Sequence, residues 1–249
     1  VAIRTTDIWL TRVLRRAAAV VSTSSYLAQD LQKRSNSRQR VCTVRNVFPP
    51  ETLIRKQPRL EGPQNELNVL YAGTLGRAQN LANALHAAKM AQDAGVHVKL
   101  RFVGAGAAKS ELIETAERLG VNAVFEQRRG AELLKECYEW ADTALVHLTD
   151  WAPLLNAVPS KTYELMVQGL HISGVVAGET AEIIRTLHAG DVVPPENPQA
   201  LADLWVSLAR NRSRLAVNDA GARWVHQERE TSAPATLVEC LEWVHASRR

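Results

Sequence analysis

The chain of 249 residues is 46% hydrophobic and 22% charged, with a formal net charge of +4 at pH 7. This composition is typical of a globular protein and excludes an intrinsically disordered chain. No run of about 18 apolar residues occurs, so we expect no membrane-spanning helix and a cytoplasmic location. The three cysteines, Cys42, Cys137 and Cys240, form no CxxC pair, which favours buried reduced thiols over a zinc site or a disulfide framework.

Basic residues form small clusters at 12–16, 33–40 and 210–214. Aromatic side chains do not interleave with them, so the clusters do not resemble a groove for single-stranded nucleic acid, and we expect no nucleic-acid partner. Two interpretations stay open: a solvated surface, or weak attraction to the anionic inner face of a cell membrane. The chain starts at Val1 inside an amphipathic pattern without signal-peptide features, and we expect it to be part of a longer protein.

The first part of the chain predicts a short unit of alternating helices and strands. Ser24 or Ser25 is placed to cap its second helix, and Pro49 and Pro50 then end regular structure. The predicted elements are a helix at 5–16, a strand at 18–22, a helix at 26–33, a strand at 41–47 and a linker at 51–66.

From residue 67 onward, apolar runs alternate with amphipathic helical patterns, which predicts βαβ units and a parallel sheet flanked by helices, an α/β fold of the Rossmann type. The predicted strands are 67–72, 98–103, 122–125, 143–148, 171–176 and 192–193. The predicted helices are 81–88, 111–119, 131–140, 160–168, 179–187, 201–208 and 235–246.

Gly104 and Gly106 follow a predicted strand and open a helix, and Glu126 lies about twenty residues further on. This resembles a dinucleotide-binding fingerprint, in which glycines admit a pyrophosphate and an acid holds a ribose. Lys109 occupies the third glycine position, however, and the strand is the second of its sheet. A tight strand-to-helix turn therefore has more support than a site for NAD or FAD.

The helix that begins after Pro159 combines phosphate-binding and ribose-binding groups. Its first amides belong to Ser160 and Lys161, and helix N-termini attract phosphate. Glu164 lies one turn further, where its carboxylate could accept hydrogen bonds from ribose hydroxyls. The alternative is a surface glutamate that balances the helix dipole. A glycine turn from Gly73 to Gly76 precedes Arg77, which could bind a diphosphate or be solvated.

Five segments in order resemble glycosyltransferase family 4, the group 1 glycosyltransferases with the GT-B fold of two facing Rossmann-like domains. They are 18–48, 69–89 (VLYAGTLGRAQNLANALHAAK), 100–127, 132–148 and 159–184 (PSKTYELMVQGLHISGVVAGETAEII). The resemblance implies that residues 1–50 end the acceptor-binding N-terminal domain. A linker then follows at 51–66, a nucleotide-sugar-binding domain at 67–225, and a C-terminal helix packing toward the N-terminal domain at 226–249.

The resemblance implies retaining transfer of a sugar from a nucleotide donor, expected to be a UDP-sugar, to a saccharide or lipid-linked acceptor, without a metal or other cofactor. Glu164 and Arg77 are the expected catalytic residues, holding the ribose and the diphosphate. The donor-binding residues implied are Gly73, Thr74, Gly76, Gln79, Gly104, Gly106, Glu126, Gln127, Arg128, Asn156, Ser160, Lys161 and Glu164.

The chain departs from the family pattern at two of these positions. Asn156 replaces the first acid of the Glu-x7-Glu motif, and Gln79 replaces the usual lysine. Both departures resemble a subgroup that acts on N-acetylated or deoxy amino sugars in surface polysaccharides. They fit a non-catalytic partner subunit equally well, and a sugar-nucleotide 2-epimerase is a further alternative. We expect this part of the protein to be nearly inactive alone, because most of the acceptor domain is missing.

Overall fold

The structure is a computed structural model that describes residues 2–35, 39–47, 60–128 and 130–247, with only the backbone at 2–5 and 131–133. The helices are α1 (Ala2–Leu14), α2 (Ser25–Arg34), α3 (Ala82–Asp93), α4 (Lys109–Leu119), α5 (Ala131–Trp140), α6 (Ser160–Gln168), α7 (Gly178–Thr186), α8 (Pro198–Arg210), α9 (Ala220–Gln227) and α10 (Ala233–Ala246). Short helical turns are η1 (Arg77–Gln79), η2 (Ala152–Asn156), η3 (Arg212–Leu215) and the π-helical η4 (Glu228–Ser232). Most of the predicted linker, 51–59, lies outside the described residues.

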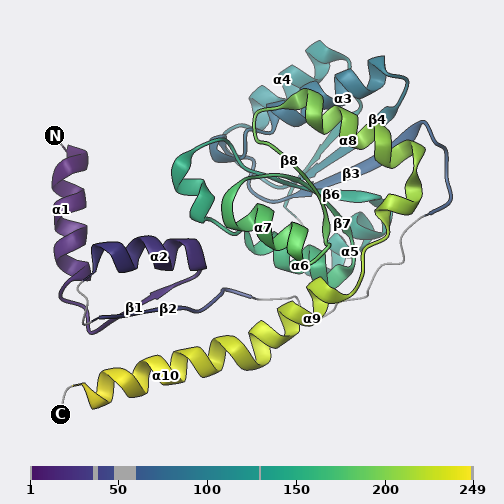
Figure 1. Cartoon of the computed structure of the whole chain (residues 1–249). Coiled ribbons are helices and arrows are strands. Elements are labelled where there is room, and N and C mark those ends of the chain that lie inside the picture. The colour runs from purple at the N-terminus through teal and green to yellow at the C-terminus, as the bar shows by residue number, and fades with distance from the viewer. Residues whose placement is uncertain (1, 36–38, 48–59, 129, 248–249) are drawn as a thin grey trace.

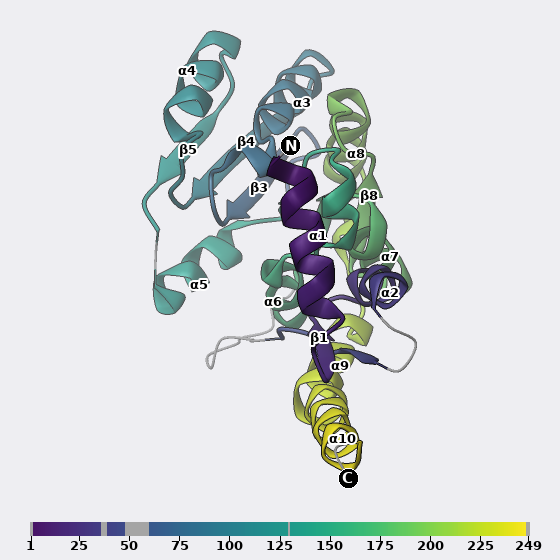
Figure 2. The ribbon, with the colours of Figure 1, turned by 90° about the vertical axis from the view of Figure 1, so that its left-hand side faces the viewer.

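The main domain is built on a parallel sheet of six strands in the order β5-β4-β3-β6-β7-β8. These strands are β3 (Glu66–Ala72), β4 (His97–Val103), β5 (Ala123–Glu126), β6 (Thr143–His147), β7 (His171–Val175) and β8 (Gly190–Val193). Helices α3, α4 and α8 cover one face of this sheet and α5, α6 and α7 the other (Figures 1 and 2). The predicted α/β fold with a helix-flanked parallel sheet is confirmed.

Strand β3 shows why both faces need a helical layer. Its Leu67, Val69 and Tyr71 pack into the core under α3 and α8, whereas Leu70 packs into the core under α5 and α6. Successive side chains of a strand point to opposite faces, so a strand that is apolar at nearly every position must be covered on both. The near-continuous apolar run therefore fixes β3 in the centre of the sheet.

A smaller unit precedes this domain. It holds α1, α2 and the two parallel strands β1 (Ala19–Ser22) and β2 (Arg40–Thr43). Ser24 caps α2 by accepting a hydrogen bond from the Leu27 amide, as its sequence position predicts. The strand predicted at 41–47 is too long, because its partner β1 ends at Ser22 and leaves no strand to pair with beyond Val44.

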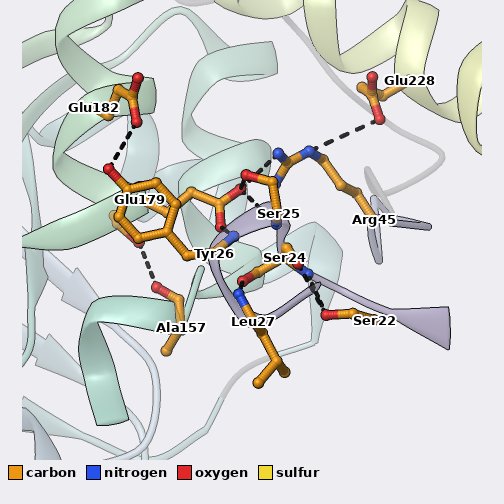
Figure 3. Close-up of polar contacts among 11 residues, drawn as sticks. Ser22, Ser24, Ser25, Tyr26, Leu27, Arg45, Ala157, Glu179, Glu182 and Glu228 are labelled. Atoms are coloured by element: carbon orange, nitrogen blue, oxygen red, sulfur yellow. Dashed lines mark hydrogen bonds and ion pairs between the residues drawn. The ribbon is translucent and has the colours of Figure 1, made fainter. Parts of the chain in front are cut away.

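A buried carboxylate, Glu179 at the start of α7, joins the small unit to the main domain (Figure 3). It accepts hydrogen bonds from the Ser25 amide (3.0 Å), the Ser25 hydroxyl (2.8 Å) and the Tyr26 amide (3.0 Å), and pairs with Arg45 at 2.5 Å. Burial alone would raise the pKa of Glu179, but the Tyr26 and Ser25 amides outweigh it and lower the pKa to about 2. The group is therefore a charged link between the two units.

The chain ends with α9, η4 and α10, which run from the main domain to the small unit (Figure 1). Helix α10 contacts β2, where Arg40 pairs with Glu239 at 3.0 Å and the buried Cys42 and Cys240 are neighbours. Its Leu237, Val238 and Leu241 are exposed, as are apolar side chains of α1. Within the described part of the chain, every helix is too short or too polar to cross a bilayer.

Candidate functional site

A cavity of about 720 Å³ lies where the carboxyl ends of β3 and β6 meet. The chain leaves β3 toward β4 on one side and leaves β6 toward β7 on the other, so the strand order reverses between these two strands. Open α/β sheets bind ligands in the crevice at such a switch point. The lining residues are Tyr71, Ala72, Gly73, Thr74, Gln79, Val103, Gly104, Ala105, Arg128, Gly130, Leu134, Leu145, Val146, His147, Leu148, Pro159, Ser160, Lys161 and Glu164.

Two glycine turns form one wall of this cavity and pack against each other. The Gly73 amide donates to the Val103 carbonyl at 3.0 Å, and the Leu75 amide donates to the Ala105 carbonyl at 2.9 Å. A Cβ atom at Gly104 would lie 1.9 Å from the Gly73 carbonyl oxygen, and one at Gly106 would lie 2.2 Å from that of Leu75. The Gly104–Gly106 pair thus serves close packing of two backbones, which explains the fingerprint without a dinucleotide.

Side chains within and beside the first turn fix its shape. The Tyr71 hydroxyl donates to the Thr74 carbonyl at 2.8 Å, and burial raises the pKa of Tyr71, which keeps this donor protonated. The Gln79 side chain accepts a hydrogen bond from the Gly76 amide at 3.2 Å. Gln79, where the family pattern has lysine, therefore orders the turn while it also lines the cavity.

Helix α6 begins at the cavity and supplies its charged groups. Pro159 precedes the helix without a side-chain cap, so the first amides are available to a ligand. Lys161 Nζ lies 2.5 Å from Glu164 Oε2, and the Tyr138 hydroxyl from α5 donates to Glu164 Oε1. Among the lining residues, Arg128 and Lys161 are cations and Glu164 is the one carboxylate. These groups and the helix N-terminus suit an anion that also carries hydroxyls.

His147, at the end of β6, is a buried neutral group at the floor of the cavity. Its side chain contacts the Asn83 amide at 3.0 Å, and its residue is only 2% exposed. Burial lowers the pKa of His147 from 6.5 to about 3. The imidazole is therefore uncharged at physiological pH, so it cannot balance the charge of a bound phosphate.

The structure brings together most, but not all, of the residues predicted for the donor site. Those that line the cavity are Gly73, Thr74, Gln79, Gly104, Arg128, Ser160, Lys161 and Glu164. Those that do not line it are Gly76, Arg77, Gly106, Glu126, Gln127 and Asn156.

Three of the residues outside the cavity have clear surroundings. Arg77 is exposed at the start of η1. Glu126 is half-buried and its carboxylate pairs with Arg101. The sequence had suggested this carboxylate for a contact with a ribose or a base. Asn156 ends η2 and is half-buried.

Tyr71, Tyr138 and His147 belong to or support the site but were not predicted from the sequence. Tyr71 and His147 lie in apolar runs, and Tyr138 lies on the apolar side of an amphipathic helix, where an aromatic side chain normally fills the core. The signal that could have found Tyr71 and His147 is their place in the last residues of two central strands, since a parallel sheet binds ligands at that edge. Tyr138 carries no such signal, because its partner Glu164 lies 26 residues away in another helix.

Several solved structures share this fold. Sucrose-phosphate synthase from Thermosynechococcus elongatus superposes with a TM-score of 0.76 at 19% identity, over 99% of this chain and 63% of that one. Anabaena HepE, solved with UDP and glucose, gives a TM-score of 0.69 at 18% identity, over 93% of this chain and 66% of that one. S. aureus TarM gives a TM-score of 0.69 at 12% identity, over 96% of this chain and 46% of that one.

These neighbours are glycosyltransferases of the GT-B type, and the chain spans about half to two thirds of their lengths. No curated protein sequence matches the chain significantly. The family profile described as "Glycosyl transferases group 1" matches residues 54–224, which is more than half of the chain and includes every residue that lines the cavity. The chain belongs to the group 1 glycosyl transferase family.

Proposed function

We propose that this chain carries the donor site of a retaining glycosyltransferase that takes its sugar from a UDP-sugar. The observation that carries the proposal is the convergence of three features on one cavity: the start of α6 at Ser160 and Lys161, the Glu164 carboxylate, and the Gly73–Thr74 turn. The fold and the family support this activity, and the cavity is the place that we propose for the nucleotide.

Different groups of the cavity bind different parts of the donor. The Lys161 ammonium and the amides at the α6 N-terminus hold the diphosphate, because both present positive charge to it. Glu164 accepts hydrogen bonds from the ribose hydroxyls. Arg128 lies at the rim and adds a second cation.

These positive groups would do most for the reaction as the bond to the sugar breaks, since charge then develops on the leaving phosphate. Among the described residues that line the cavity, no serine is hydrogen-bonded to His147 or Glu164 in the contacts shown, so none is an activated nucleophile. The leaving phosphate itself assists the acceptor hydroxyl in this proposal, and no metal takes part. Transfer by the complete protein should therefore persist in EDTA.

The acceptor in this proposal is a saccharide or a lipid-linked sugar at the inner face of the cell membrane. Two neighbours support this class: one is an outer core galactosyltransferase for lipopolysaccharide, and another is S. aureus TarM in complex with α-GlcNAc-glycerol and UDP. Asn156 and Gln79 are the support for an N-acetylated or deoxy amino sugar as the donor. A screen of UDP-sugars with the complete protein tests that choice.

Titration calorimetry tests the site directly. The chain should bind UDP more tightly than GDP and should not bind NAD. Glu164→Ala should weaken UDP binding about 10- to 100-fold, because hydrogen bonds to a charged group contribute about 1.5–3 kcal/mol each. Glu182→Ala is the matched control, since Glu182 is exposed on α7 and bonds only to the Tyr26 hydroxyl in the described contacts. Binding of NAD alone would refute the proposal.

A non-catalytic partner subunit is the second candidate, and Asn156 is the observation that favours it. Asn156 stands where the family pattern has its first acid, and it does not line the cavity. Sugar transfer by the complete protein, abolished by Glu164→Ala, would exclude this candidate. Turnover of the donor without any acceptor would instead indicate a 2-epimerase.

A further inference from the structure

Tyr138 lies directly behind the carboxylate that the proposed function assigns to the ribose. It belongs to α5, is 3% exposed and does not line the cavity, so it cannot touch a nucleotide itself. Its hydroxyl donates a hydrogen bond to Glu164 Oε1. Any influence of Tyr138 on a ligand must therefore pass through the side chains that its hydroxyl contacts, of which Glu164 accepts its hydrogen.

The side chains of Lys161, Tyr138 and Glu164 form a cluster in which each is hydrogen-bonded to the other two. Lys161 Nζ donates to Glu164 Oε2 at 2.5 Å and to the Tyr138 oxygen at 3.2 Å. A hydroxyl has a single hydrogen, so with Lys161 donating to its oxygen Tyr138 directs that hydrogen to Glu164. Both oxygens of the carboxylate are thereby held, which fixes the rotation of its plane.

The Tyr138 hydroxyl also keeps its proton. Burial raises the pKa of Tyr138, and the nearby Glu164 charge raises it further, so the hydroxyl stays protonated throughout the physiological range. A carboxylate oxygen has two acceptor sites, so Oε1 can bind a ribose hydroxyl without releasing Tyr138. The tyrosine can thus hold Glu164 both before and after a nucleotide binds.

We propose that Tyr138 is a positioning residue, which holds the Glu164 carboxylate in the orientation that accepts hydrogen bonds from the ribose hydroxyls of the bound nucleoside diphosphate. The inference rests on the proposed function, because it needs Glu164 to contact the ribose. The proposal adds a residue of α5 to the site. Recognition of the ribose hydroxyls then depends on α5 as well as on α6. A core tyrosine without this role would affect every ligand of the cavity alike.

The test compares UDP with 2′-deoxy-UDP by calorimetry on the 249-residue chain. The wild type should prefer UDP. Tyr138→Phe removes one hydroxyl and keeps the ring, and it should weaken UDP binding about 3- to 10-fold while it changes 2′-deoxy-UDP binding less. The preference for the ribose then falls. Tyr163→Phe is the control, because Tyr163 is buried in α6 beside Glu164 but does not line the cavity. It should leave the preference unchanged.

A second measurement keeps the inference testable if Tyr138→Phe lowers stability. In a Glu164→Ala background, adding Tyr138→Phe should cause no further loss of UDP affinity if the tyrosine acts through the carboxylate and not through its contact with Lys161. An unchanged preference in Tyr138→Phe, or an equal loss in both backgrounds, overturns the inference and leaves the proposed function standing. A wild type that binds no UDP, or that does not distinguish the two nucleotides, instead refutes the ribose role of Glu164.

Discussion

Gly106 sits where any side chain would collide with the neighbouring turn. An added Cβ would lie 2.2 Å from the Leu75 carbonyl oxygen, and backbone cannot rotate away as a flexible side chain could. We therefore expect Gly106→Ala to destabilise the fold by about 1–3 kcal/mol or more, as overpacked sites do. Denaturant unfolding followed by circular dichroism measures the change.

Gly130→Ala is the matched control for this prediction. Among the described residues, no atom lies within 4 Å of a Cβ built at Gly130, and its φ of −66° suits any residue. Its unfolding free energy should stay within about 0.5 kcal/mol of the wild type. Equal stability of Gly106→Ala and the wild type would show that the two turns do not pack as described.

The residues of the site differ in how well a sequence could identify them. Ser160, Lys161 and Glu164 were predictable, because a helix start after a proline and a spacing of four residues place them on one edge by local geometry alone. Glu126 was placed by the fingerprint, yet its pairing with Arg101 across β4 and β5 depends on strand order. Strand order is a long-range property, which local spacing does not contain.

At the scale of elements, Glu179 makes most of the hydrogen bonds that the structure shows between α2 and α7. Glu179→Gln removes the charge opposite Arg45 and one acceptor of the amides at the α2 N-terminus. Breaking such a buried pair should cost about 2–4 kcal/mol. Hydrogen exchange of the Ser25 and Tyr26 amides should report the loss. Glu182→Gln, which affects only an exposed hydrogen bond from Tyr26, should have little effect.

The same contact predicts a dependence on pH. The pKa of Glu179 is lowered from 4.5 to about 2, so its contribution to stability is complete above 4.5 and is lost as the pH falls toward 2. The unfolding temperature of the wild type should therefore fall more between about pH 6 and about pH 3 than that of Glu179→Gln. Parallel profiles for the two proteins would contradict the charged link.

The elements themselves were largely predictable from periodicity, with α5 and α6 found at the residues where the sequence places them. Helix α9 was missed, because it is short and contains Gly221, which packs against Met166. The π-helical η4 was also missed. Its Ala233 amide bonds to the Glu228 carbonyl, and this wider turn relieves the clash that Pro234 would make in an α-helix. Tertiary packing decides both features.

At the scale of the whole molecule, the described residues form one sheet of six strands and a second sheet of two strands. Three or more strands are generally needed for an independently stable sheet, so these two strands are a small part of a domain. The chain also spans only 63% of the sucrose-phosphate synthase and 46% of TarM. We expect the acceptor site of the complete protein to need chain beyond these residues.

The 249-residue chain should therefore bind UDP in calorimetry but transfer no sugar to an acceptor in a turnover assay. The binding measurement serves as the control, because a preparation that binds UDP is folded at the donor site. The exposed apolar side chains of α10, Leu237, Val238 and Leu241, should become protected from solvent in the complete protein, since further chain would pack near the small unit. Transfer by the 249-residue chain at the rate of the complete protein would show instead that the residues described here build both substrate sites.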